Sequence, residues 1–126
     1  GSNSSFGASF VDGDIISVAL DLDNNTIAWA NNGAYGGGVD SNSWSGSLSA
    51  THAITAPAST TNGHYFIAGG FNGFNSTVRM LYNFGGCSAF TVASGNADAN
   101  GYGNFEYAVP SGYYAICTKN LAEFGG

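Results

Sequence analysis

The stretch GDIISVALDLDNNTIAWANNG, residues 13–33, decides the fold of this chain. Its first part, from Asp14 to Leu22, is mostly apolar and rich in β-branched residues, a composition typical of a buried strand. Because both faces of this strand would be apolar, the pattern predicts that the strand lies in the centre of a sheet.

Two turns follow this strand closely. The first is Asp-Asn-Asn at 23–25, since Asn and Asp tolerate the positive φ that a tight hairpin turn requires. The next strand alternates, which places Ile27 and Trp29 on the face opposite to their neighbours. Asn32-Gly33 then gives the strongest two-residue hairpin signal. The stretch therefore predicts strand, turn, strand, turn.

The rest of the chain carries strand signals separated by turn-forming residues. No apolar period of the helical type is long enough to predict a helix, and no internal repeat occurs. The chain is therefore expected to be all-β, an antiparallel β-sandwich that forms a single domain over residues 1–126. A loop rich in Gly, Ser and Asn is expected at 34–49. Further strands are expected at 50–57, 64–71, 76–84, 87–92, 105–109 and 112–118.

Three motifs resemble those of SPRY (B30.2-like) domains. The first is the opening Gly-Asp of the stretch above, with its aromatic residue before Asn-Gly; the second is YNFGG at 82–86, followed by Phe90. The third, PSGYYAICTKNL at 110–121, resembles the ending of SPRY-like domains in bacteriophage and marine-virus structural proteins. The resemblance implies a SPRY/concanavalin-like jelly roll, a recognition function and a virion or other extracellular location.

The chain departs from a full SPRY domain before the Gly-Asp motif. The strands that precede this motif in the family are lacking here, so the sandwich is expected to expose an apolar face. We expect the parent polypeptide, a neighbouring subunit or a modified topology to cover this face.

Composition and charge narrow the classes of partner. Charged residues make up only 8% of the chain, which disfavours an intracellular helical protein. Arg79 and Lys119 alone oppose eight acids, for a net charge of −6, so the chain is not expected to bind nucleic acid. No apolar run is long enough for a membrane-spanning helix, so membrane insertion is not expected.

Residues that could carry chemistry are few and scattered. The run 21–25 resembles a calcium loop only superficially, because it lacks the glycine and the distal Glu that such loops use. Turn formation explains the acidic run 98–101 equally well. Glu106 is expected to face solvent, and His52 and His64 lack a neighbouring nucleophile motif. No enzyme activity, metal or cofactor is therefore expected.

Cys87 and Cys117 lie in or beside expected strands, thirty positions apart. A disulfide between them is geometrically possible. Two buried free thiols are the other interpretation.

Three functions fit the sequence. The first is a tail-fibre or other appendage module that contacts host-surface glycans or protein. The second is a purely structural subunit of a capsid decoration or extracellular filament, a homo-oligomer in which a neighbouring subunit completes the sandwich. The third, a cellular SPRY adaptor that presents a peptide, fits the viral-type ending and the scarcity of Lys poorly. Loop aromatics suit neutral sugars because their rings stack on sugar faces. The candidate ligand-binding residues are Tyr35, Trp44, His52, Phe71, Phe74 and Tyr102.

Overall fold

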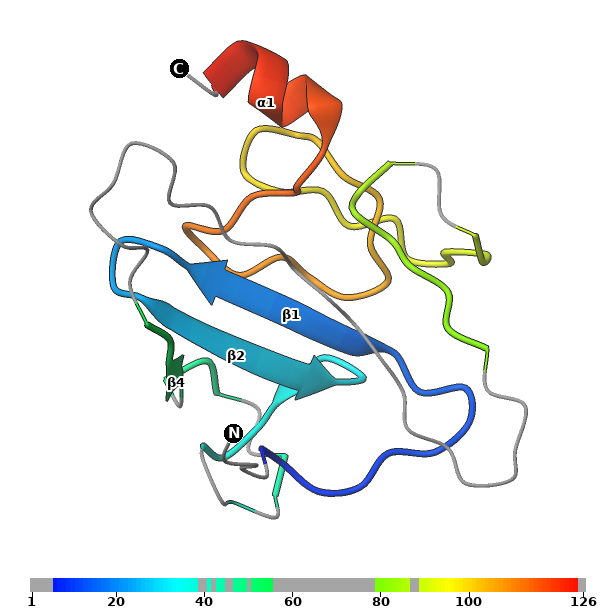
Figure 1. Cartoon of the computed structure of the whole chain (residues 1–126). Helices are drawn as coiled ribbons and strands as arrows, with labels where there is room; N and C mark the ends of the chain where they lie inside the picture. Colours follow the sequence, from blue (N-terminus) through cyan, green and yellow to red (C-terminus); the bar gives the residue numbers. More distant parts are fainter. Residues whose placement is uncertain are drawn as a thin grey trace.

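A computed structural model describes residues 6–38, 41, 43–44, 47–49, 51–55, 79–86 and 89–124 of the chain. These residues form one antiparallel sheet and one short helix, so the described structure is mainly β (Figure 1). The sheet has the order β1-β2-β3, and β4 also pairs with β2. The elements are β1 (Ile16–Asp21), β2 (Thr26–Asn31), β3 (Ala34–Tyr35), β4 (His52–Ala53) and α1 (Thr118–Phe124).

The predicted first hairpin is confirmed. Strands β1 and β2 pair in antiparallel register from Ile16 opposite Asn31 to Asp21 opposite Thr26. In the connecting turn, the Asp21 carboxylate accepts hydrogen bonds from the backbone N of Asn24 at 2.9 Å and from its side-chain Nδ2 at 2.7 Å. Asn25 ends the turn with a φ of 54°, the left-handed conformation that Asn tolerates.

The predicted Asn-Gly hairpin is confirmed as well. Asn32 and Gly33 both have positive φ, 48° and 82°, as a type I′ turn requires. The turn returns the chain into β3, where Tyr35 lies opposite Ala30. A Cβ atom on Gly33 would lie 2.7 Å from the ring of Tyr107, so this position also needs glycine for space.

The order of the strands differs from the prediction. Strand β2, which pairs with three others, is the central strand of the described sheet, whereas β1 pairs only with β2 there. The apolar residues of β1 do not mark burial on both faces, because Ile16 and Val18 are exposed on one of them. The apolar run therefore indicated a strand correctly, but within the described sheet this strand is not the central one.

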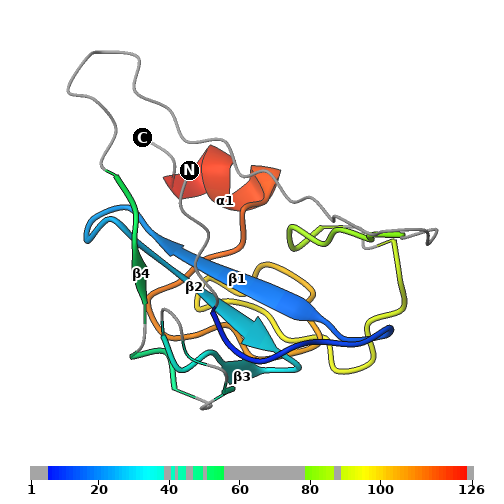
Figure 2. The same cartoon turned by 60° about the horizontal axis from the view of Figure 1, so that its bottom comes forward.

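The two faces of the sheet carry side chains of different size. Ala19, Ala28 and Ala30 share one face and are buried, and Tyr35 lies on the same face because it pairs with Ala30. Tyr113 lies near enough to Tyr35 to raise its pKa, after the larger effect of burial, so the segment before α1 meets the sheet on this side. Figure 2 shows this yellow-to-orange segment beside the strands. Small residues let the segment approach the sheet closely.

Several expected strands do not form, and one helix was not predicted. The segment 112–118 contains no strand and leads into α1. Of 105–109 only Phe105 pairs, in an isolated bridge with Asn96. The described parts of 76–84 and 87–92 contain no strand, whereas the described part of 50–57 contains β4. The expected strand 64–71 lies outside the described residues.

Candidate functional site

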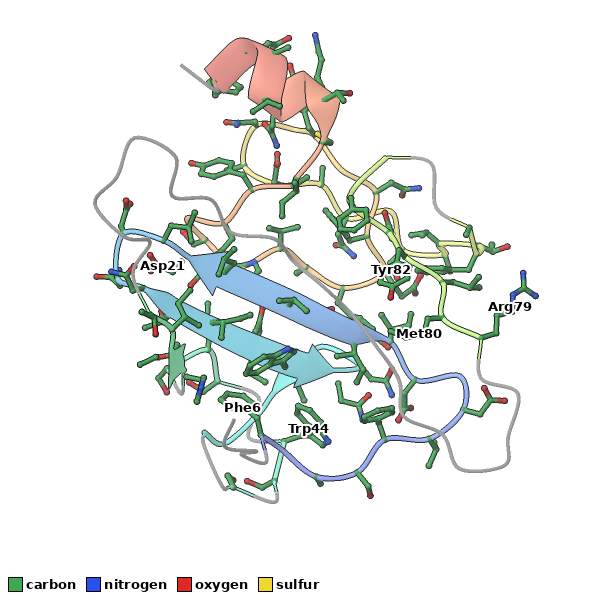
Figure 3. All side chains as sticks on the ribbon, in the orientation of Figure 1. Phe6, Asp21, Trp44, Arg79, Met80 and Tyr82 are labelled. Atoms are coloured by element: carbon green, nitrogen blue, oxygen red, sulfur yellow. The ribbon has the colours of Figure 1, made fainter. Side chains whose placement is uncertain are left out.

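Four aromatic side chains gather on the Trp29 face of the sheet; we call Phe6, Trp29, Trp44 and His52 the aromatic cluster. The ring centroids of Phe6 and Trp29 lie 4.9 Å apart in an edge-to-face arrangement, with planes at 63°. The ring of His52, from β4, lies 6.3 Å from that of Trp29. Phe6 and Trp44 are labelled near β2 in Figure 3.

Two glycines provide the space for this cluster. A Cβ atom on Gly36 would overlap the ring of Phe6 and lie 3.4 Å from Cζ3 of Trp44. A Cβ atom on Gly7 would lie 2.6 to 2.8 Å from three carbons of the Trp44 ring, and Gly7 has a φ of 82°. Phe6 and Gly7 therefore pack closely against Trp29, Gly36 and Trp44.

Backbone pairing holds the segment of Trp44 against that of Gly36. Gly36 and Trp44 form an antiparallel bridge, and the backbone N of Gly37 donates to the carbonyl of Ser43 at 2.9 Å. Phe6 forms a parallel bridge with Ser41. The indole Nε1 of Trp44 is buried, and no group within the described ranges accepts a hydrogen bond from it. The Trp44 ring thus packs inside the chain, with its polar atom turned away from solvent.

The six predicted ligand-binding residues do not form one site. Trp44 and His52 belong to the aromatic cluster, whereas Tyr35 lies on the opposite face of the sheet. Burial raises the pKa of Tyr35, and the nearby Tyr113 raises it further. Phe71 and Phe74 lie outside the described residues.

Tyr102, the sixth of them, lies far along the chain beside α1. Its hydroxyl donates a hydrogen bond of 2.7 Å to the Glu123 carboxylate, and this bond raises the pKa of Tyr102. The ammonium of Lys119 lies 5.6 Å from the centre of the Tyr102 ring and pairs with Glu123. Tyr102 therefore contacts the helix.

Sequence reasoning did not identify Phe6 as the partner of Trp29. Trp29 was assigned to its face correctly from the alternation of β2, but nothing local shows that Phe6 reaches it across 23 positions. The one usable signal is Phe6-Gly7 itself, because glycine after an aromatic residue permits a close approach of backbone to another ring.

The Gly-Asp motif serves to fasten two hairpins together. The Asp14 carboxylate accepts hydrogen bonds from the backbone N of Val11 at 2.8 Å and from the side-chain amides of Asn32 at 2.7 Å and Asn31 at 3.1 Å. The bond from Val11, followed by those from Asn32 and Asn31, lowers the pKa of Asp14. Asn32 in turn accepts from the backbone N of Ile15 at 3.0 Å. The start of β1 is therefore tied to the Asn-Gly turn.

A second network surrounds Asp98, which the sequence assigned only to a turn. Its carboxylate is buried and accepts hydrogen bonds from the backbone N of Ala115 at 2.9 Å and from Nδ2 of Asn120 at 2.6 Å. It also accepts from the backbone N of Asn100 at 2.9 Å and of Tyr102 at 3.0 Å. Burial raises the pKa of Asp98, but these four hydrogen bonds lower it by more. The net pKa of the carboxyl group therefore lies below its usual value.

Glu106, which was expected inside a strand, lies in a bend. Its carboxylate accepts from the backbone N of Ala93 at 2.7 Å and from the hydroxyl of Ser94 at 2.9 Å. The bond from Ala93 and then that from Ser94 lower the pKa of Glu106. The side chain was expected to face solvent, and its hydrogen bonds to Ala93 and Ser94 are exposed ones that close a loop at the surface.

Many large apolar side chains are exposed. Tyr82 and Phe84 stack with ring centroids 6.2 Å apart and planes at 3°. Figure 3 shows Met80 and Tyr82 on the same extended segment as Arg79. The exposed large apolar residues are Phe10, Val11, Ile16, Val18, Leu22, Met80, Leu81, Tyr82, Phe84, Tyr114, Ile116, Leu121 and Phe124.

Within the described ranges, no group of three or more His, Cys, Asp or Glu residues could hold a metal ion. None of the helical segments described is long and apolar enough to span a membrane. Cys117 is a free, half-buried thiol, and Cys87 lies outside the described residues.

In comparisons with known proteins, no family model, curated protein or solved structure matches this chain. The assignment of function therefore depends on the residues and contacts described above.

Proposed function

We propose that this chain is a non-enzymatic module of a virion, built as a SPRY-like β-sandwich. It would belong to a tail fibre or another appendage that contacts glycans or protein on the host surface. Three features support this proposal: the motifs at 13–33, 82–86 and 110–121, the antiparallel sheet, and the exposed apolar side chains.

One observation carries the proposal of a contact function. The buried hydrophobic residues of the described ranges are all alanines, Ala19, Ala28, Ala30 and Ala115, whereas many large apolar side chains are exposed. Exposed apolar patches on a folded domain mark surfaces that contact protein or ligand. The stacked pair Tyr82–Phe84 is typical of such a surface, because rigid rings give contact area at a low cost in conformational entropy.

The state of the acids supports a function without catalysis. A general acid requires a carboxyl group whose pKa is raised toward the working pH. Asp14, Asp21, Asp98, Glu106 and Glu123 instead have lowered pKa values, because each accepts hydrogen bonds from groups of the same chain. These carboxylates organise loops.

A second candidate function is that of a structural subunit completed by its neighbour. The observation that favours it is the exposure of Ile16 and Val18 on β1, within the sheet itself. An apolar sheet face that is open to water is normally covered by another layer. In an assembly, that layer would come from an adjacent copy.

Binding to immobilised neutral glycans and to host cells tests the host-contact function. Wild type is expected to bind, and Tyr82→Ser combined with Phe84→Ser is expected to lose binding with an unchanged melting temperature. His52→Ala tests whether the aromatic cluster contributes to binding. If no host-surface component binds, or if every ring variant binds as wild type does, the host-contact function is wrong.

Trp44→Ala separates the two roles of that side chain. If Trp44 contacts ligand, binding is lost and the melting temperature stays the same. If Trp44 only anchors its loop, the melting temperature falls because the contact between its ring and Gly7 is lost.

A further inference from the structure

The pair Asn-Gly occurs at 32–33 and 100–101 in the described part of the chain, and at 62–63 and 72–73 outside the described residues. Glycine has no Cβ atom, so no side chain shields the backbone N that follows such an asparagine. This nitrogen can attack the side-chain amide of the asparagine before it, which makes Asn-Gly a chemically reactive pair. The two described pairs differ in how strongly the fold restrains this reaction.

The first pair lies at the surface. Asn32 and Gly33 are both exposed, and the backbone N of Gly33 makes no hydrogen bond within the described residues. The side-chain amide of Asn32 is held by Asp14, Ile15 and Tyr107 at 2.7, 3.0 and 3.4 Å, in three hydrogen bonds that are all exposed. Because water replaces an exposed hydrogen bond at little net cost, these bonds restrain the amide weakly.

The second pair belongs to the buried network of Asp98. The backbone N of Gly101 donates to the Asp98 carbonyl at 3.0 Å, so the attacking nitrogen is already engaged. The Asn100 side-chain amide donates to Asn120 at 2.9 Å, and the Asn100 backbone N donates to the Asp98 carboxylate at 2.9 Å, both in partly buried bonds. Attack on Asn100 therefore has to break hydrogen bonds inside the fold, whereas attack on Asn32 breaks exposed ones.

We infer that Asn32 is a site of spontaneous deamidation in the folded protein. The Gly33 nitrogen attacks Cγ of Asn32, and a new C–N bond forms while the bond from Cγ to Nδ2 breaks. The proton of the Gly33 N–H leaves with the departing NH2 group as ammonia, and a cyclic imide remains. Water then opens the imide at either of its carbonyl carbons, which yields aspartate or isoaspartate. The reaction needs no reagent other than water.

Both products undo the contact that fastens the start of β1. Nδ2 of Asn32 now donates to the Asp14 carboxylate, and an aspartate in its place would set a second negative carboxylate against the first. Isoaspartate lengthens the backbone of a two-residue turn whose flanking residues, Asn31 and Ala34, pair with each other. Deamidation therefore adds a negative charge and separates the Asn-Gly turn from Asp14.

Peptide mass spectrometry of the purified chain, incubated in mildly alkaline buffer, tests the reaction. In the folded protein Asn32 is expected to convert about tenfold faster than Asn100, because the hydrogen bonds at Asn100 add to its barrier. In urea, where these bonds are absent, the two sites are expected to convert at similar rates. Asn32 that converts in urea but not in the folded protein would overturn the inference, and so would equal rates at the two sites in the folded protein.

A pair of variants tests the consequence. Asn32→Asp reproduces one product, and aspartate tolerates the positive φ of 48° at this position. The variant is expected to have a lower urea midpoint than wild type. The loss is expected to be smaller when Asp14→Asn is also present, because the facing carboxylate is then gone. An equal loss in both backgrounds would show that the product does not act on Asp14. None of these measurements depends on a virion, so this site and the proposed function can fail separately.

Discussion

The side-chain amide of Asn120 donates a hydrogen bond of 2.6 Å to the carboxylate of Asp98, and both residues are buried. The same amide donates to the Ala115 carbonyl at 3.0 Å, while the Asn120 oxygen accepts from Asn100 at 2.9 Å. One side chain on α1 thus joins the helix to two segments that precede it.

Replacement of Asn120 by Ala is expected to lower the free energy of unfolding by about 2 kcal/mol, because it removes one of the four hydrogen bonds to the buried Asp98 carboxylate and a second hydrogen bond to the Ala115 carbonyl. Urea denaturation measures this change. Asn104→Ala is the matched control, since the Asn104 side chain is exposed and its backbone carbonyl, which accepts from Asn83 at 2.7 Å, is retained. Equal losses for both variants would contradict the role given to Asn120.

Acid is expected to destabilise the protein. The pKa of Asp98 in the folded state lies below the ordinary value of 3.8, and that of Glu106 below 4.5. A carboxyl whose folded pKa is lowered adds stability above its unfolded pKa and loses it as the pH falls through the folded value. Denaturant midpoints should therefore be constant near neutral pH and should fall below about pH 4.5. Asp98→Asn should show a shallower fall, and a midpoint that stays the same from pH 7 to pH 3 would refute the account.

Gly7→Ala and Gly13→Ala separate steric fit from backbone strain. Both glycines have left-handed backbones, with φ values of 82° and 90°, so both substitutions should cost about 1–2 kcal/mol in conformational energy. Only Gly7 has a ring where the new Cβ would lie; at Gly13 nothing lies within 4 Å. Gly7→Ala should therefore be the less stable variant and should alone shift tryptophan fluorescence. If the two variants match in both properties, Gly7 is not packed on Trp44.

Asp14 and Asn32 are expected to be energetically coupled. Asn32→Gly keeps the positive φ of the turn but removes the side chain that bonds Asp14 at 2.7 Å. Asp14→Ala removes the other partner. A double-mutant cycle followed by urea denaturation should give a double-variant loss smaller than the sum of the single losses. Strict additivity would show that the two residues act independently.

The hairpins could be predicted from sequence because their signals are local. Asn32-Gly33 specifies positive φ at two adjacent residues, and no distant contact is needed to interpret it. The contacts of Phe6 and Asn120 could not be predicted in the same way. Phe6 meets Trp29 across the chain, and α1 has seven residues, too few for an apolar period to become visible.

The predicted site residues show the same limit. Trp44 and His52 lie on one face of the sheet. Gly36 pairs with Trp44 and faces the same side, and Tyr35 precedes Gly36 by one residue, so its side chain lies on the opposite face. A loop composition rich in aromatics indicates rings near one another in sequence, and it does not specify the face on which each ring lies. Asp98 was assigned to a turn because its partner Asn120 lies 22 positions away.

The central claim is that this chain is a contact module on the outside of a virus particle. Labelling of purified particles with an antibody against the chain, viewed by electron microscopy, tests it most directly. The account predicts label on the particle surface, either at the tips of appendages, where host-cell extract would block it, or repeated along a shaft or shell. Particles that carry no label, while the chain is detected in the same preparation outside them, would contradict it.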